Sequence, residues 1–466
     1  MTVTAPPRGP ETRHDRDLER RVADLEALIE EARRRARRRR IAIGIALLLT
    51  AAGLAGLSGS FGGGRGSGGA ALAGDSGGKA QFSGSAVALA ALPRGNVASA
   101  FAFDPRRPSV VYVASADARG GVYVFKTTDG GQHWRSTKAR GSGWRSDILS
   151  LTADPLRSGT LYAGTDTAVY KTVNGGRTWK PFRRGLFPRP HKVCYSQSFA
   201  GRLVQRCSRY HPYGTPGKTD WNRNNGWVLD VAVDPIHSRV VYSAAGGVRK
   251  STDGGRTWKT VLQPTWRTVV TRVAIAPTRP ESIYAIAHGP TGATAIYKST
   301  NAGRTWQVMG ASSLPPSCCG DSEDSLAADP GNPQTLYGAI GDTVFATTNG
   351  GASWQPMANG LPAHDVTSLS VDPRQSGTAY ASAMVNLNRV KTNAIYQPAG
   401  AIYKTTDGGR TWSQVFSSIG VGKVAVDPAR PSTIYATGWA PQDRTHNRNM
   451  RLLRSTDGGH TWAISR

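Results

Sequence analysis

The sequence predicts an all-β protein whose main part is a seven-bladed β-propeller of four-stranded blades. Three observations lead to this prediction. A motif of eight residues occurs seven times, a strand that ends in Asp-Pro, or once in Ala-Pro, stands before each copy, and the repeating part, residues 97–466, gives about 53 residues per repeat. A repeat of that length suits one four-stranded propeller blade with its loops, whereas a β-helix would need shorter repeats.

The eight-residue motif, hereafter the box, reads Thr/Ser-x-Asp/Asn-x-Gly-x-x-Trp. Its Asx side chain can accept backbone N–H bonds in a tight turn, its glycine supplies a positive φ, and its tryptophan can fill the layer between sheets. We therefore expect each box to be a structural hairpin. The Asx residues are Asp129, Asn174, Asp253, Asn301, Asn349, Asp407 and Asp457, and the tryptophans are Trp134, Trp179, Trp258, Trp306, Trp354, Trp412 and Trp462.

The second repeated element is an apolar strand that ends in Asp-Pro and is followed, eight residues after the Asp, by Tyr. It occurs at Asp104, Asp154, Asp234, Asp329, Asp372 and Asp427, and Ala276 replaces the Asp in one copy. Proline lacks the N–H that a central strand needs, so Asp-Pro marks a turn between two strands.

One repeat shows the expected order of strands. In the second repeat, residues 149–154, 160–164, 168–172 and 178–182 read as strands, and the box lies between the third and the fourth. The last box ends four residues before the C-terminal Arg466, so the last strand of the seventh blade must be short. We expect the apolar stretch 86–92 to pair there and close the ring.

The boxes TTDGGRTW (405–412) and STDGGRTW (251–258) make the chain resemble Asp-box proteins, the bacterial neuraminidase repeat group, over about 370 residues. That group includes sialidases, xyloglucanase-type glycoside hydrolases, sortilin-like receptors and photosystem II assembly-factor propellers. With its Asp-Pro and Tyr unit, the chain is most similar to the last three. The resemblance implies that the box is structural and lies away from the ligand face, so it predicts the scaffold and leaves the function open.

The N-terminal part differs from the repeats. Residues 1–40 hold 12 Arg and 8 acidic residues with a narrow apolar stripe, which predicts a charged helix. This helix is either simply solvated or a weak dimer contact. Residues 41–57 carry no charge and predict one transmembrane helix, and residues 58–96 form a Gly/Ser-rich tether before the propeller at 97–466.

The charge around residues 41–57 predicts the orientation in the membrane. Seven arginines lie among residues 33–40, directly before the apolar run, which places residues 1–40 in the cytoplasm and the propeller outside the plasma membrane. The alternative is secretion after cleavage of a signal peptide, although a charged region of this length is unusual for one.

The predicted strand order places the boxes and Asp-Pro turns at one end of the blades and all long insertions at the other end, the long-loop face. These insertions are basic and aromatic, which suits an envelope protein or an anionic polysaccharide; the alternative is that the loops are merely solvated. The outside location argues against nucleic acid. Candidate binding residues are Tyr195, Tyr210, Trp221, Trp227, Arg389, Trp439 and Arg444.

The cysteines and histidines indicate no cofactor. Cys194 and Cys207 lie in one insertion and form a candidate disulfide, which would suit an oxidising location. The nine histidines are scattered rather than placed at ligand spacing, so we expect no metal and no other cofactor.

Carboxylates for catalysis are scarce. A glycosidase needs two carboxylates about 5 to 10 Å apart, and only two Glu follow residue 40. Asp166, Asp321 and Asp324 are weak candidates, and Asp166 resembles the strand-end Asp of xyloglucanase-type enzymes. The three-Arg cluster of sialidases has no counterpart. We therefore expect a binding or assembly scaffold rather than an enzyme, with a xyloglucanase- or sialidase-like glycoside hydrolase as the alternative.

Overall fold

The computed structural model describes residues 89, 92, 97–116, 122–137, 148–187, 191–199, 202–210, 227–264, 268–289, 293–309, 314, 324–340, 343–362, 366–385, 399–417, 420–439 and 450–465. The chain divides into two compact units, Met1–Asp75 and Ser76–Arg466, and the fold described here is that of the second. The predicted charged helix and transmembrane helix lie outside the described residues. Within these ranges, no helix is long and apolar enough to cross a membrane.

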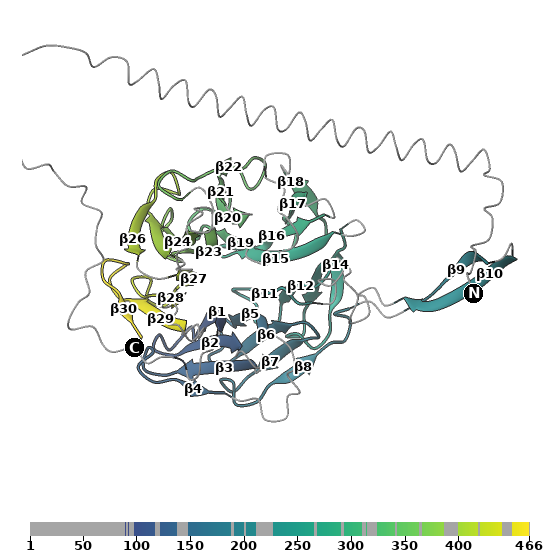
Figure 1. The fold of residues 1–466 in the computed structure, drawn as a ribbon, viewed down its shortest axis with the longest axis horizontal. Coiled ribbons are helices and arrows are strands. Elements are labelled where there is room, and N and C mark those ends of the chain that lie inside the picture. Colours follow the sequence, from purple (N-terminus) through teal and green to yellow (C-terminus); the bar gives the residue numbers. More distant parts are fainter. Residues whose placement is uncertain are drawn as a thin grey trace, which may run out of the picture. The chain divides into compact units, whose positions relative to one another are not determined.

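Seven antiparallel four-stranded sheets follow one another along the chain and form the ring of a seven-bladed propeller (Figure 1). Blade 1 holds β1 (Val97–Phe103), β2 (Val111–Ala116), β3 (Val122–Thr127) and β4 (Arg135–Ser136). Blade 2 holds β5 (Ile148–Ala153), β6 (Leu161–Thr165), β7 (Val169–Thr172) and β8 (Lys180–Phe182). Blade 3 holds β11 (Asp230–Val233), β12 (Val241–Ala244), β13 (Val248–Ser251) and β14 (Lys259–Leu262).

The remaining four blades repeat this order. Blade 4 holds β15 (Val269–Ala276), β16 (Arg279–His288), β17 (Thr294–Ser299) and β18 (Gln307–Met309). Blade 5 holds β19 (Ser325–Ala328), β20 (Leu336–Ile340), β21 (Thr343–Thr347) and β22 (Gln355–Pro356). Blade 6 holds β23 (Val366–Val371), β24 (Ala379–Val385), β25 (Ala399–Thr405) and β26 (Ser413–Ser417). Blade 7 holds β27 (Gly420–Val426), β28 (Ile434–Trp439), β29 (Met450–Ser455) and β30 (Ala463–Ile464).

In the part of the chain that the structure describes, each blade takes its four strands from one continuous stretch of sequence. The first strand of each blade contacts the first strand of the next, and β27 contacts β1. The described sheet of blade 7 ends at its own β30. Most of the stretch 86–92 lies outside the described residues, so its pairing there stays a prediction. Of that stretch, the structure describes Leu89 and Leu92, both buried, and Leu92 packs against Tyr435 and Leu452 of blade 7 and Val111 of blade 1. These leucines therefore help to seal the junction by packing.

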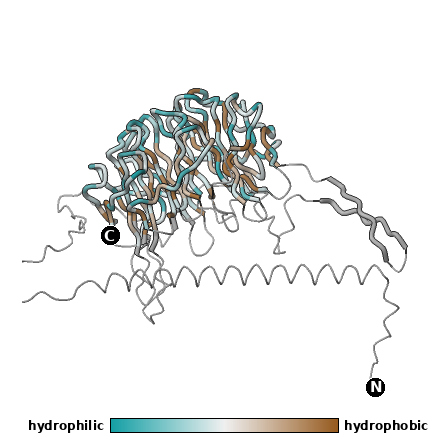
Figure 2. Tube along the Cα trace, turned by 90° about the horizontal axis from the view of Figure 1, so that it is seen from above, coloured by the Kyte–Doolittle hydropathy of each residue, from teal (hydrophilic) through white to brown (hydrophobic). Residues whose placement is uncertain are grey.

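The hydrophobic core lies at the boundaries between blades. Tyr337 of blade 5, for example, packs in one cluster with Val366, Ala381 and Trp412 of blade 6. The tyrosine that follows each Asp-Pro turn is at most 1% exposed in every blade. Hydrophobic residues occur along the strands and hydrophilic ones gather at the turns (Figure 2), because a middle strand of a blade is covered by a neighbouring blade on each side.

Each box forms a tight turn held by its own side chains. In blade 1, the N–H of Gly131 donates to Thr127 Oγ1 at 2.9 Å and the N–H of His133 donates to Asp129 Oδ1 at 3.0 Å. Gly130 and Gly131 have φ values of 70° and 101°, which disfavour a side chain. In blade 4, Ala302 takes the place of the first glycine and adopts a φ of 57°. The turn geometry is therefore the same in all seven copies despite the change from Asp to Asn.

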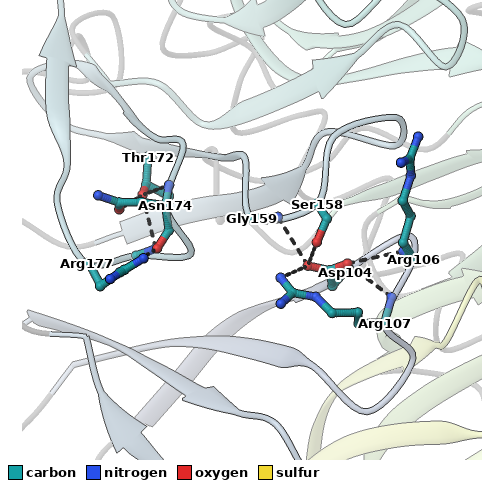
Figure 3. Close-up of polar contacts among 9 residues, drawn as sticks. Asp104, Arg106, Arg107, Ser158, Gly159, Thr172, Asn174 and Arg177 are labelled. Atoms are coloured by element: carbon teal, nitrogen blue, oxygen red, sulfur yellow. Dashed lines mark hydrogen bonds and ion pairs between the residues drawn. The ribbon is translucent and has the colours of Figure 1, made fainter.

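The box and the Asp-Pro turn of a blade touch, and both reach the next blade. The N–H of Gly175 in the second box donates to the carbonyl of Gly159 in the Asp-Pro turn at 2.8 Å. Across the boundary, Asp104 Oδ2 accepts hydrogen bonds from Ser158 Oγ at 2.7 Å and from the N–H of Gly159 at 3.2 Å (Figure 3). Asp104 therefore caps its own turn and links blade 1 to blade 2.

A two-stranded hairpin interrupts the series between blades 2 and 3. It consists of β9 (His191–Phe199) and β10 (Arg202–Tyr210), and its register places Cys194 directly opposite Cys207. Directly opposite residues of antiparallel strands have Cα atoms about 4.5 to 5.5 Å apart, within the range that a disulfide spans. The sequence did not lead us to expect strands here.

Candidate functional site

The first strands of the blades surround the central channel, and polar residues gather at its end on the long-loop face. Each first strand starts at this face and ends at its Asp-Pro turn, as the pairing of Val97 with Ala116 and of Phe103 with Val111 shows for blade 1. A cavity of about 220 Å³ opens at this end of the channel. Its charged lining residues are Asp230, Arg272, Asp324 and Lys423, hereafter the mouth site.

Asp324 stands directly before β19 and is 5% exposed. Its Oδ2 lies 2.5 Å from His288 Nε2 and accepts a hydrogen bond from Thr271 Oγ1 at 2.8 Å. Burial raises the pKa of Asp324, but the interaction with His288, the charge of Arg272 and the Thr271 hydrogen bond outweigh burial and hold it below its ordinary value. Asp324 is therefore an ionised group fixed in place by its neighbours.

Asp230 is the first residue of β11, and its carboxylate accepts hydrogen bonds from two backbone N–H groups. The N–H of Val231 donates to Oδ1 at 2.9 Å, and the N–H of Val273 in the next blade donates to Oδ2 at 3.1 Å. Burial raises the pKa of Asp230, while the charge of Arg272 and these two hydrogen bonds oppose the rise. Asp230 thus connects blades 3 and 4 at the rim of the channel.

The two cations of the mouth site are held by backbone carbonyls. Arg272 donates through Nε to the carbonyl of Asp324 at 2.6 Å and through one terminal nitrogen to the carbonyl of Thr271 at 2.8 Å. Lys423 Nζ donates to the carbonyl of Thr367 at 3.2 Å. The mouth site therefore presents fixed charges of both signs to the channel.

Thr294, His288 and Asp324 form a hydrogen-bonded series. Thr294 Oγ1 lies 3.3 Å from His288 Nδ1, whose Nε2 reaches Asp324. The order hydroxyl, imidazole and carboxylate is that of a nucleophilic triad. All three residues, however, are 5% exposed, and of the three only Asp324 lines the cavity. The series therefore fixes the position of Asp324.

The sequence pointed to part of this site. Asp324 belongs to it, whereas Asp321 lies outside the described residues. Asp166 lies apart from it, in the turn between β6 and β7, where its Oδ1 is buried without a hydrogen-bond partner. Arg272, His288 and Lys423 were missed as site residues, although each is a charged or polar residue inside a strand, which is an available sequence signal.

The predicted binding residues are only partly described. Trp227 is partly buried and stands three residues before β11. Tyr195 lies in β9, Tyr210 in β10 and Trp439 at the end of β28. Trp221, Arg389 and Arg444 lie outside the described residues, so their role stays a prediction.

The other end of the channel is mostly apolar. A cavity of about 400 Å³ there is lined by Phe101, Phe103 and Leu151, together with prolines of three Asp-Pro turns. Among the residues that the structure describes, no group of three or more His, Cys, Asp or Glu side chains could hold a metal ion. The two ends of the channel therefore differ in chemistry, since four charged residues line the cavity at the long-loop end and one, Arg374, lines the cavity at the other end.

Comparison with known proteins places this fold among propellers of two kinds. A xyloglucanase of Paenibacillus sp. is 25% identical over 299 residues, which cover 53% of this chain and 27% of that protein. The photosystem II assembly lipoprotein Ycf48 of Picosynechococcus sp. is 29% identical over 149 residues, which cover 30% of this chain and 42% of that protein. No family model matches the chain.

A solved structure supports the same fold. The GH74 enzyme of Niastella koreensis superimposes with a TM-score of 0.53 over 81% of this chain and 55% of that enzyme, at 18% identity. The chain covers between about a quarter and two fifths of the curated relatives it matches. As predicted, the chain is a seven-bladed β-propeller similar to xyloglucanases and to a photosystem II assembly factor.

Proposed function

We propose that this protein is a binding scaffold that holds a segment of a partner protein over the mouth site on the long-loop face. The single observation that carries this proposal is that hydrogen bonds hold both carboxylates of the mouth site in place. Asp324 is held by His288 and Thr271, and Asp230 by two backbone N–H groups. A general acid or base must exchange a proton with a substrate, whereas these carboxylates are committed to positions in the protein.

The distribution of charge favours a protein segment over an anionic polysaccharide. Arg272 and Lys423 lie beside Asp230 and Asp324 in the lining of one cavity of about 220 Å³. A polymer of uniform negative charge would meet repulsion from the two carboxylates, whereas a peptide offers donors, acceptors and charges of both signs. The similarity to a lipoprotein named for photosystem II assembly adds support for an assembly role.

Capture of the partner with matched variants tests this proposal. The tagged full chain is crosslinked in cells, washed at high salt and analysed by mass spectrometry. Arg272→Ala and Lys423→Met should reduce the captured partner about tenfold, because each removes a charge-assisted contact. Arg279→Ala and Lys259→Met are controls, since both residues are exposed and lie outside the mouth site. Equal capture by all four variants, or capture of glycopolymer instead of protein, would contradict the proposal.

A xyloglucanase-like hydrolase is the second candidate. Asp166 supports it, because one of its carboxylate oxygens is buried without a partner in a turn on the long-loop face. Incubation of the full chain with xyloglucan oligosaccharides would decide between the two. If the chain releases reducing sugar and Asp166→Asn abolishes this release, the protein is a hydrolase. If no sugar is released at high protein concentration, this second candidate function is excluded.

The location is part of the same proposal. Residues 41–57 anchor the chain in the plasma membrane, residues 1–40 lie in the cytoplasm and the propeller lies outside. Protease added to intact cells should then digest the propeller and leave a tag at residue 1 protected. A soluble propeller in the medium would show that the segment is cleaved, and a protected propeller would reverse the orientation.

A further inference from the structure

Four of the seven boundaries between blades repeat one contact, which makes them controls for the others. A tyrosine hydroxyl donates to the carbonyl of the fourth box residue in the next blade. This occurs from Tyr162 to Gly254, from Tyr242 to Ala302, from Tyr380 to Gly458 and from Tyr435 to Gly130, at 3.1 to 3.4 Å. Lys171, Lys250 and Lys404 donate to the same carbonyls at 2.8 to 3.1 Å. At two further boundaries the tyrosine hydroxyl has another acceptor: Tyr284 donates to the carbonyl of Pro333 and Tyr337 to Asp329 Oδ2.

The boundary between blades 1 and 2 lacks this contact. Tyr112 is 0% exposed, and its hydroxyl has no hydrogen-bond partner. Lys126, the equivalent of Lys171, lies over the ring of Tyr112 at 5.4 Å from its centroid, and Nζ makes no hydrogen bond among the described residues. Both groups still reach the second box, because a Cβ on Gly175 would lie 2.9 Å from Lys126 Nζ and 3.1 Å from the Tyr112 hydroxyl. Among the described residues, these two buried or half-buried donors have no hydrogen-bond acceptor.

A basic groove of about 640 Å³ opens at this boundary. We call it the blade 1–2 groove; its basic residues are Arg107, Lys126, His133, Arg135 and Arg177. Figure 3 shows its two sides, with Asn174 and Arg177 of the second box on one and Arg107 beside Asp104 on the other. The groove belongs to the box face, at the opposite end of the blades from the mouth site.

The charges in the groove are not balanced by its own carboxylates. Asp104 pairs with Arg107 at 2.9 Å and Asp129 with His133 at 2.7 Å. Burial lowers the pKa of Lys126, and the charges of Arg107 and Arg177 lower it further, against the pull of Asp104. The groove is therefore lined by several cations, of which Lys126 is partly desolvated, an arrangement that a bound anion would stabilise.

We propose that the blade 1–2 groove binds a small anion that carries at least two phosphate- or sulfate-type groups. Guanidinium and ammonium groups that converge on one space match oxyanions with several acceptor oxygens. The volume of about 640 Å³ exceeds the space that one such group needs. This site is independent of the mouth site and adds a second ligand to the proposed scaffold.

Calorimetric titration of the full chain with pyrophosphate, at fixed ionic strength, tests the proposal. Lys126→Met and Arg177→Ala should each weaken binding about tenfold, the loss expected for one charge-assisted hydrogen bond. Lys171→Met and Arg256→Ala are the matched controls, because they occupy the same repeat positions at another boundary. Both controls should bind pyrophosphate as the unchanged chain does.

A second set of probes identifies the source of the anion. Tighter binding of a glycerol phosphate oligomer than of pyrophosphate would indicate that the natural ligand is a phosphodiester polymer. Tighter binding of pyrophosphate would indicate a free small molecule. Binding of citrate as tightly as both would overturn the assignment to phosphate- or sulfate-type groups. If all four variants weakened pyrophosphate binding equally, the binding would be explained by diffuse attraction to a chain of net charge +27. That result would overturn the proposed site. No binding of any probe to the unchanged chain would overturn it as well.

Discussion

Replacing one repeated tyrosine by phenylalanine should affect stability differently at two boundaries. The hydroxyl of Tyr380 donates to the carbonyl of Gly458 at 3.1 Å, and Tyr380 is 1% exposed. Loss of such a hydrogen bond costs about 0.5–1.5 kcal/mol. Because Lys404 still donates to the same carbonyl, no buried acceptor is left alone. We therefore expect Tyr380→Phe to lower the free energy of unfolding by about 1 kcal/mol, in the middle of that range.

Tyr112→Phe is the matched variant and should behave in the opposite way. The Tyr112 hydroxyl is buried without a partner, and an unsatisfied buried polar group costs about 1–3 kcal/mol. Its removal in phosphate-free buffer should therefore leave the free energy of unfolding unchanged or raise it. The two rings are equally buried, so loss of packing cannot explain a difference between the variants.

Urea unfolding of both variants, followed by tryptophan fluorescence, measures the difference. The comparison requires equal m-values, which show that both variants expose the same surface. A Tyr112→Phe variant destabilised as much as Tyr380→Phe would refute the reasoning, because it would mean that the Tyr112 hydroxyl has an acceptor. Such a result would also remove one of the two unmet donors on which the blade 1–2 groove depends.

Three further predictions concern the boxes. Trp462→Ala should lower the free energy of unfolding by about 3–5 kcal/mol, since Trp462 is 2% exposed and packs on Phe416, and urea unfolding at a lower midpoint would check this. Ala302→Gly should raise the melting temperature slightly, because an alanine at a φ of 57° costs about 1 kcal/mol that glycine avoids; a lower melting temperature would contradict this. Burial raises the pKa of Asp253, but hydrogen bonds from Thr257 outweigh it and lower the pKa to about 2. A carboxylate whose pKa is lowered by folding stabilises the fold above about pH 4, and this stabilisation is lost as pH falls toward 2. The box of Asp253 should therefore open at low pH before the box of Asn174, which cannot titrate, and hydrogen exchange would measure the difference.

The repeats made most of the fold predictable. Seven boxes alternating with seven Asp-Pro units, or their Ala-Pro variant, fix the number of blades, the order of strands and the end at which the turns lie. The closure of the ring was not predictable in the same way. Leu92 packs in one cluster with Tyr435 of blade 7, and packing between residues 343 positions apart in the sequence leaves no local pattern.

The site was less accessible from sequence than the fold. Asp324 was a candidate because acidic residues are rare in the repeats, but its partner His288 stands at the end of a strand in another blade. The ring brings Asp230, Arg272 and Lys423 together from three blades. Their spacing along the sequence does not predict that they are close in space. The unmet donors at Tyr112 and Lys126 are visible only by comparing boundaries in the structure.

Photocrosslinking from the two ends of β11 tests the proposed scaffold most directly. Trp227 stands before this strand on the long-loop face, and Ile236 follows it in the Asp-Pro turn, where it is 58% exposed. A photoreactive amino acid at position 227 should give one partner adduct in cells, and Arg272→Ala should reduce its yield about tenfold. The same amino acid at position 236 should give none. An adduct at position 236 alone, or one at 227 that Arg272→Ala leaves intact, would contradict a partner held over the mouth site.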